Sequence, residues 1–384
     1  MLRGEVYSTL SQESSIIKRL LRIDFVILAC TLLLSGISIL ILFAIRGEYI
    51  APMYLVQGGA TALGIVAVLF ISQIDYQDVC DKLTIPLFIF SILLLLATLV
   101  IGSEGDYGSK SWIRIPGIPV NIQPSEFVKL FLIITFAKHL SREKSNINHP
   151  FTLIRLMLHA SPIIILVLLQ GDLGTALVYM VMIVAMLFAA GLSLWYFVGI
   201  GVVAVIATPY LWPYLGEYQQ MRILCGFNPE LDPEYYGFQA LAAKRAISSG
   251  GLFGKGLFGG SLYQSVPMAN SDSIFAIIGE KFGFIGCMLI FVTFITLIIR
   301  IIWIAKNARK TYSGYICVGI SAVLIAQFIE NIGMNLAMLP VVGITLPFLS
   351  YGGSSVLSLY LMVGIVESIY VHKQKYFFER ELPE

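Results

Sequence analysis

The residue best suited to chemistry in this 384-residue chain is Asp272. It lies in the run NSDSIFAIIGEKFG (residues 270–283), just before a long apolar stretch, with Glu280 two helical turns farther on. A carboxylate where lipid meets water is costly unless it is used or paired. An aspartate of ordinary acidity is ionised at neutral pH and can take a proton from a hydroxyl group. Asp272 is therefore the first candidate for a general base, and capping the following helix is its structural alternative.

A second group of candidates lies in the Gly- and Pro-rich stretch of residues 102–129. Arg114 could bind phosphate oxygens through two parallel hydrogen bonds. Trp112 beside it belongs either to such a site or to the aromatic belt of a membrane surface. Glu126 and Lys129 are three residues apart at a helix start, so they share a helix face and can form an ion pair. This pair is either self-neutralised near the membrane boundary or part of a polar cavity.

Two further segments carry candidate residues. In QGDLGTAL (residues 170–177), Asp172 either caps the next helix or holds Lys129 or Arg114 in position. GGLFGKGLFGG (residues 250–260) contains Lys255 but lacks the Gly and the Ser or Thr that a nucleotide-binding loop needs, so nucleotide binding is rejected. A flexible gate with Lys255 near a substrate phosphate is the interpretation left open.

The composition indicates how these residues are positioned. Hydrophobic residues make up 58% of the chain and charged residues only 12%, which is typical of an integral membrane protein. Because one membrane helix takes about 20 apolar residues, the sequence predicts an all-α polytopic protein with about ten spans in a single domain of residues 1–384. The expected spans lie near residues 23–45, 53–72, 83–101, 126–140, 153–170, 173–190, 196–212, 274–304, 314–338 and 354–371.

The distribution of Lys and Arg predicts the orientation. These residues gather in the short loops on the side of both termini, which places residues 1–22 and 372–384 in the cytoplasm. The polar N-terminal segment has no cleavage pattern, so the first span is an anchor. The long loop between spans seven and eight, residues 213–273, is then extracytoplasmic and carries Asp272 to the outer face. The net charge of +2 gives no indication of nucleic-acid binding.

Residues 339–355 (LPVVGITLPFLSYGGSS) are broken by Pro and Gly and are expected to dip back towards the membrane. Irregular backbone at that depth is tolerated only where it is buried in protein or lines a cavity. In the preceding span, Asn331 and Asn335 are expected to be packing residues rather than reactive ones.

Five motifs in order give the chain a specific resemblance. They are WIRIPGIPVNIQPSEFVK, QGDLGTAL, SSGGLFGKG, NSDSIFAIIGEKFG and LPVVGITLPFLSYGGSS. Together, over about residues 24–373, they resemble the SEDS family, which includes RodA and FtsW of bacteria. The ending GIVESIYVHKQK favours RodA over FtsW. Ser273 and Lys281 stand where the family usually has Phe and Glu, so the local electrostatics near Lys281 are expected to differ.

The resemblance implies a peptidoglycan glycosyltransferase of the bacterial cytoplasmic membrane. Such a protein polymerises lipid II into β-1,4 glycan strands at the outer face and releases undecaprenyl pyrophosphate. It works in cell elongation, or alternatively in division, with a class B penicillin-binding protein and other elongation machinery. The resemblance makes Asp272 the catalytic residue and matches Trp112, Arg114, Glu126 and Lys129 to family residues.

This chemistry needs one base and a positive field for the pyrophosphate. Asp272 would activate the acceptor hydroxyl, while Arg114, Lys129 and Lys255 would face the phosphates. A divalent cation, Mg²⁺ or Mn²⁺, could do similar work, and the sequence leaves the metal undecided. Two other functions are considered: a lipid II flippase and a non-enzymatic activator of the transpeptidase.

The sequence also suggests where the transpeptidase docks. The surface is expected on spans eight and nine, where Gly279, Gly283 and Gly286 are closely spaced, because small residues allow helices to approach closely. We expect them to form a lipid-facing surface for the partner.

Overall fold

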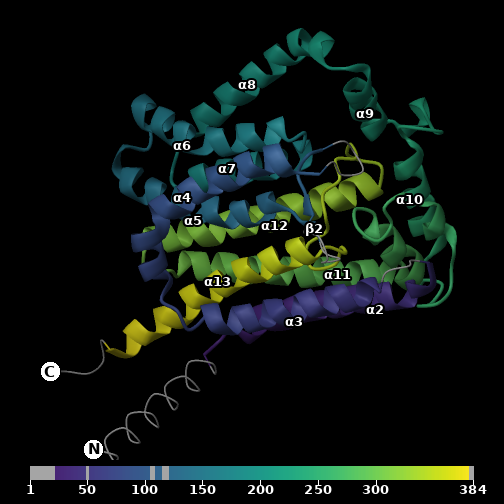
Figure 1. Cartoon of the computed structure of the whole chain (residues 1–384), viewed down its shortest axis with the longest axis horizontal. Coiled ribbons are helices and arrows are strands. Elements are labelled where there is room, and N and C mark those ends of the chain that lie inside the picture. The colour runs from purple at the N-terminus through teal and green to yellow at the C-terminus, as the bar shows by residue number, and fades with distance from the viewer. Residues whose placement is uncertain (1–21, 49–51, 104–108, 115–120, 380–384) are drawn as a thin grey trace, which may run out of the picture.

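The computed structural model describes residues 22–48, 52–103, 109–114 and 121–379, and within them the chain is mostly α-helical (Figure 1). Each of the ten expected spans corresponds to one helix. These helices are α2 (Phe25–Ala44), α3 (Met53–Ile71), α4 (Tyr76–Ile101), α5 (Pro124–Glu143), α6 (Pro150–Leu169), α7 (Leu173–Ala189), α8 (Leu194–Leu211), α11 (Ile274–Lys306), α12 (Thr311–Asn335) and α13 (Gly353–Glu379).

Short elements connect the long helices. They are the helices α9 (Glu217–Phe227) and α10 (Phe238–Ser249), the 3-10 turns η1 (Arg46–Glu48), η2 (Lys144–Asn146), η3 (Trp212–Tyr214), η4 (Pro229–Leu231) and η5 (Leu262–Ser265), and the two-residue strands β1 (Ile113–Arg114) and β2 (Asn121–Ile122). The strands pair antiparallel, with Arg114 opposite Asn121.

Seven of the described helices have the length and apolar composition needed to cross a membrane: α2, α3, α4, α6, α11, α12 and α13. Helices α7 and α8 are apolar but shorter. Helix α5 falls outside this group because charged residues such as Glu126, Lys129 and Lys138 interrupt its apolar sequence. The fourth span therefore differs in kind from the others: it carries charge into the protein interior.

Helix boundaries follow local capping chemistry as well as hydropathy. Helix α4 begins at Tyr76, earlier than the apolar stretch alone suggests, because the Asp75 side chain accepts a hydrogen bond from the Gln77 amide at its start. Asp24 caps α2 in the same way through the amides of Val26 and Ile27.

The bundle has two chemically different ends. In Figure 1, α9 and α10 lie at one end of the long axis and the labelled termini lie at the other. Hydrogen bonds join the polar segments at the first end: the Ser354 hydroxyl donates to the Asn121 carbonyl (2.9 Å), and the Ser350 hydroxyl donates to the Ser271 carbonyl (2.6 Å). The segments expected at the outer face thus meet at one end.

Helix α11 is broken at Gly283, and the loop of residues 250–260 completes its backbone hydrogen bonding. The amides of Phe284 and Ile285 donate to the carbonyls of Gly251 (2.9 Å) and Leu252 (3.1 Å). In the other direction, the Lys255 amide donates to the Glu280 carbonyl (2.9 Å). The loop expected as a flexible gate is therefore hydrogen-bonded into the break of a membrane helix, where every backbone polar group needs a partner.

Close approach of these two segments requires glycine. Gly254 and Gly283 have φ angles of +78° and +63°. A Cβ atom on Gly254 would lie 2.2 Å from the Lys281 carbonyl oxygen. Gly279 packs against Ile247 of α10, whose Cα would be 3.0 Å from an added Cβ. The prediction is wrong for Gly279 and Gly283, which are buried and serve packing within the chain instead of facing lipid, whereas Gly286 is half-buried.

We expect Gly254→Ala to destabilise the protein more than Gly256→Ala. Both glycines have positive φ angles, but a Cβ on Gly256 would meet no atom within 4 Å. Gly256→Ala should cost only the backbone strain, of order 1–3 kcal/mol, whereas Gly254→Ala adds a collision with backbone. Thermal unfolding of both variants in detergent measures the difference. Equal unfolding temperatures would contradict the close packing of this loop on α11.

Candidate functional site

Asp272 lies in the turn that precedes α11 and is largely buried, with 8% of its surface exposed. The N-cap residue of α11 is Ser273, so Asp272 stands one position before the cap. Its backbone carbonyl accepts hydrogen bonds from the side-chain amides of Asn331 (2.7 Å) and Asn335 (3.1 Å). Both asparagines thus have the packing role expected from the sequence, and they fix the backbone that carries the carboxylate.

The irregular segment of residues 339–355 braces the same turn from another side. The Tyr351 amide donates to the Asn270 carbonyl (3.0 Å). The Ser350 hydroxyl, besides binding Ser271, accepts from the Leu346 amide (2.7 Å). Most of residues 344–350 are buried, so this non-helical backbone is enclosed by protein, as expected.

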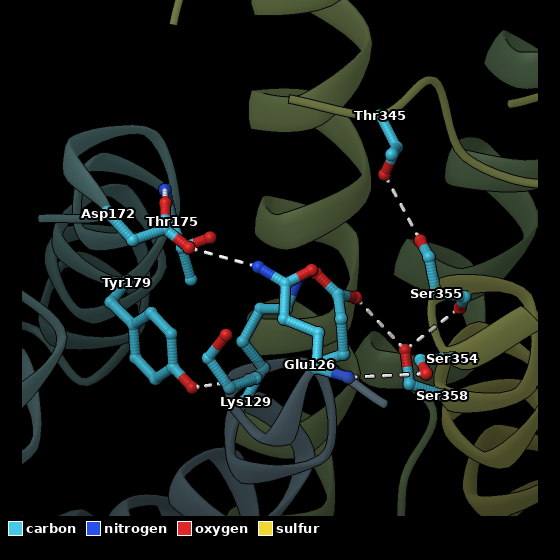
Figure 2. Close-up of polar contacts among 11 residues, drawn as sticks. Glu126, Lys129, Asp172, Thr175, Tyr179, Thr345, Ser354, Ser355 and Ser358 are labelled. Carbon is cyan, nitrogen blue, oxygen red and sulfur yellow. Dashed lines mark hydrogen bonds and ion pairs between the residues drawn. The ribbon is translucent and has the colours of Figure 1, made fainter. Parts of the chain in front are cut away.

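Glu126 and Lys129 form the expected ion pair on α5, at 2.7 Å. Both residues are almost fully buried, with 4% and 1% of their surfaces exposed. The Ser358 hydroxyl of α13 donates to the second carboxylate oxygen of Glu126 (3.1 Å). Figure 2 shows this cluster between the helices, with Thr345 and Ser355 joined beside it at 3.1 Å. The pair therefore lies inside the protein.

Asp172 has the capping role that was one of its two predicted roles. Its carboxylate accepts from the Thr175 amide (2.9 Å) at the start of α7 and from the Gln123 side chain (3.0 Å) just before α5 (Figure 2). It thus joins the starts of two helices, and its hydrogen-bond partner next to α5 is Gln123, not Lys129 or Arg114. Burial raises the pKa of the Asp172 carboxyl, although hydrogen bonds from Thr175 act to lower it.

Trp112 and Arg114 lie on or beside β1, at the same end of the bundle. The Trp112 carbonyl accepts from the Ser103 amide (2.8 Å), which fixes this strand to the end of α4. Arg114 is exposed, and its strand partner Asn121 is the residue that binds Ser354. The structure therefore anchors the backbone of this segment and leaves the guanidinium group accessible.

Glu280, on α11, forms an ion pair with Lys255 of the loop of residues 250–260. Glu280 is fully buried and accepts from the Lys255 ammonium group (3.2 Å) and from the amides of Leu262 (3.1 Å) and Tyr263 (2.8 Å). The neighbouring Lys281 ammonium lies 4.6 Å from the centre of the Tyr263 ring. Glu280 therefore holds the glycine-rich loop against α11, and Lys255 is part of that attachment.

Glu280→Gln is expected to lower the free energy of unfolding by about 1–3 kcal/mol. The amide has a single acceptor oxygen, so one of the buried donors around it would lose its partner. Thermal unfolding in detergent measures the loss, and Glu234→Gln, at an exposed glutamate of the long loop of residues 213–273, is the matched control. A variant as stable as the control would mean that Glu280 does not hold the loop.

The sequence interpretation missed the hydroxyl groups that connect these parts. Ser350, Ser354 and Ser358 bind, in turn, the Asp272 turn, the β2 strand and Glu126. Ser350 and Ser354 lie in the run SYGGSS, and Ser358 follows it by three residues. This concentration of serine after a Pro-broken stretch is the sequence feature that could have predicted these hydrogen bonds.

The fold and the site define the class: an integral membrane protein with a braced carboxylate and a polar, partly buried cluster at one end of a helical bundle. The profile of the FtsW/RodA/SpoVE family, described as "Cell cycle protein", matches residues 19–375. The chain belongs to this family, called SEDS above. It is a glycosyltransferase and a multi-pass protein of the bacterial cytoplasmic membrane.

Individual relatives agree with this assignment. The chain is 35% identical to the peptidoglycan glycosyltransferase MrdB of Escherichia coli K12, over 92% of this chain and 94% of that protein. It is 34% identical to the "Probable peptidoglycan glycosyltransferase FtsW" of Trichlorobacter lovleyi, over 91% and 94%. A solved structure titled "Structural coordination of polymerization and crosslinking by a peptidoglycan synthase complex" matches with a TM-score of 0.80 and 26% identity, over 91% and 98%.

Proposed function

We propose that this protein polymerises lipid II into β-1,4 glycan strands of peptidoglycan at the outer face of the cytoplasmic membrane, releasing undecaprenyl pyrophosphate. The names of the relatives support peptidoglycan as the product. The observation that carries the proposal is the bracing of Asp272. Two asparagine side chains and the segment of residues 339–355 hold its backbone at the end of the bundle opposite the chain termini. A general base needs such fixed geometry.

In the proposed reaction, the Asp272 carboxylate takes the proton from the 4-hydroxyl of the acceptor sugar. The freed oxygen attacks the anomeric carbon of the donor, the bond to the pyrophosphate breaks, and the configuration at that carbon inverts. Hydrolytic glycosidases of the two-carboxylate type need an acid to protonate the departing oxygen. Pyrophosphate leaves without that help when cations meet its charge, so one carboxylate is sufficient here.

Among the cations expected to meet the pyrophosphate, Arg114 is the one whose accessibility suits the task. Lys129 is buried and paired with Glu126, and Lys255 is paired with Glu280. Both lysines therefore form ion pairs within the protein when no substrate is bound. Arg114 is exposed on a strand whose backbone is anchored, and guanidinium groups bind phosphate oxygens in pairs. We therefore propose Arg114 as the first phosphate contact and Lys129 and Lys255 as supporting charges.

A divalent cation, Mg²⁺ or Mn²⁺, belongs to the proposal as an additional group. Among the described residues, no three His, Cys, Asp or Glu side chains form a ready cage. Asp272 would supply one ligand and the pyrophosphate oxygens and water the others, which is a donor set common for Mg²⁺. The ion would offset the charge of the leaving group.

We further propose that the protein acts in cell elongation with a class B penicillin-binding protein. The RodA-like ending of the sequence supports elongation, while the near-equal identities to MrdB (35%) and FtsW (34%) keep division as the alternative. The similarity to a chain from a peptidoglycan synthase complex supports a cross-linking partner.

The test is a polymerisation assay with fluorescent lipid II, the purified protein and its transpeptidase partner. We expect glycan strands that a muramidase digests to disaccharide units. The same protein in vesicles, without the partner, should not move lipid II between leaflets. Flipping without strand synthesis would replace the proposal by a flippase, and stimulated cross-linking without strands would replace it by a scaffold.

A further inference from the structure

A hollow of about 480 Å³ lies at the end of the bundle opposite Asp272, where α5 ends and α12 begins. Four cationic side chains line it: Lys138, Arg142, Arg309 and Lys310. They come from two segments that are far apart in the sequence, the last turn of α5 and the α11–α12 connection. Nothing in the chemistry proposed for Asp272 uses this site.

The hollow carries an excess of positive charge. Lys138 forms an ion pair with Asp81, and none of the residues that line the hollow is acidic. Thr311, the first residue of α12, also lines the hollow, and the first turn of this helix has no acidic residue. The amides and the dipole of a helix start favour an anion. The positive charge of the hollow and the start of α12 therefore both favour an anionic ligand.

Tyr312 provides an independent observation. It lines the hollow and is 4% exposed, yet its hydroxyl group has no hydrogen-bond partner in the part of the chain that the structure describes. The ammonium groups of Lys138 and Lys310 lie 4.6 Å and 5.5 Å from the centre of its ring. A buried hydroxyl without a partner is rare in proteins. The hydroxyl is closed to a ligand in the hollow, and it is the ring that lies beside two of the lining cations.

The general excess of Lys and Arg in cytoplasmic loops does not explain this arrangement. Orientation in the membrane depends on how many cations a short loop carries, without requiring them to converge. Lys144 and Lys306 are cations of this general kind. Both are exposed near the same end of the bundle, and neither lines the hollow.

We propose that this hollow binds the phosphate of an anionic phospholipid headgroup from the cytoplasmic leaflet. The hollow lies at the ends of membrane helices, on the side of the termini, which the Lys and Arg distribution assigns to the cytoplasm. Lipid headgroups are found at that level, and basic pockets between membrane helices on this side suit anionic lipids. A soluble phosphate has the same charge and is the other source of this chemistry.

The experiment compares the wild-type protein with Arg142→Gln/Lys310→Gln in nanodiscs that contain phosphatidylglycerol, cardiolipin and phosphatidylcholine. Native mass spectrometry after release counts the retained lipids. We expect the wild type to retain anionic lipid over phosphatidylcholine. Removal of two cations should lower that retention by roughly 25-fold, about fivefold for each charge.

Lys144→Gln/Lys306→Gln is the matched control, because it removes the same charge from the same end of the bundle outside the hollow. It should retain anionic lipid like the wild type. Equal losses in both double variants, or no loss in either, would overturn the site. A separate arm adds inorganic phosphate to detergent-purified protein. A rise in unfolding temperature with phosphate, together with no retained anionic lipid, would overturn the lipid as the source.

Discussion

Replacement of Asp272 by alanine is expected to reduce glycan polymerisation by at least about 100-fold, the lower range for loss of a general base. The carboxylate is the proposed proton acceptor, whereas its backbone carbonyl, which binds Asn331 and Asn335, is retained in the variant. Folding should therefore be preserved while the chemistry is lost. Initial rates of strand formation from lipid II, with the transpeptidase partner present, measure the effect.

Two further variants make this result specific. Asp272→Asn keeps the size of the side chain and removes its basicity, so it should be as inactive as the alanine variant. Glu234→Ala removes an exposed carboxylate from the same long loop and should polymerise at the wild-type rate. An alanine variant at position 272 that folds normally and polymerises at a near-normal rate would reject the assignment.

Lys129→Met is expected to lower the free energy of unfolding by about 3–5 kcal/mol. Lys129 is 1% exposed, and its removal takes the cation from the buried Glu126, which keeps the hydrogen bond from the Ser358 hydroxyl. Without its cation, the buried carboxylate keeps its desolvation cost and loses the attraction that offsets it, so the folded state is destabilised. Equilibrium unfolding in mixed micelles of increasing SDS content measures the change.

The double variant Lys129→Met/Glu126→Gln distinguishes lost charge from lost packing. Because it removes both charges, it should recover much of the stability that Lys129→Met loses. Lys144→Met, at an exposed lysine beyond the end of α5, should be nearly neutral. If Lys129→Met were as stable as this control, the pair would not be the buried structural element described above.

The sequence predicted those parts of the fold and the site that depend on neighbouring residues. Apolar segment lengths located the ten helices, the spacing of Glu126 and Lys129 predicted their ion pair, and helix capping was one of the two roles predicted for Asp172. The ion pair and the helix cap each depend on residues only three positions apart, so they can be predicted from a short piece of sequence.

Contacts between distant segments could not be predicted in the same way. The hydrogen bonds of Ser350 and Ser358 join segments 79 and 232 residues apart. The sequence also hides the break at Gly283, because its immediate neighbours, Phe282 and Phe284, are both apolar. For this reason the glycines of α11 suggested a surface for a partner helix, although they are occupied by the protein's own loop.

The hydrogen bonds that close the break in α11 determine how Asp272 can move. The first turns of α11 and the loop of residues 250–260 share backbone hydrogen bonds, and Glu280 adds side-chain bonds to the following turn. The loop is bonded to α11 on both sides of Gly283, so it closes the break and holds the turn that carries Asp272 in a fixed orientation relative to the rest of the helix. We expect a protein that binds residues 250–260 and loosens these hydrogen bonds to lower the reaction rate without any contact with the substrate.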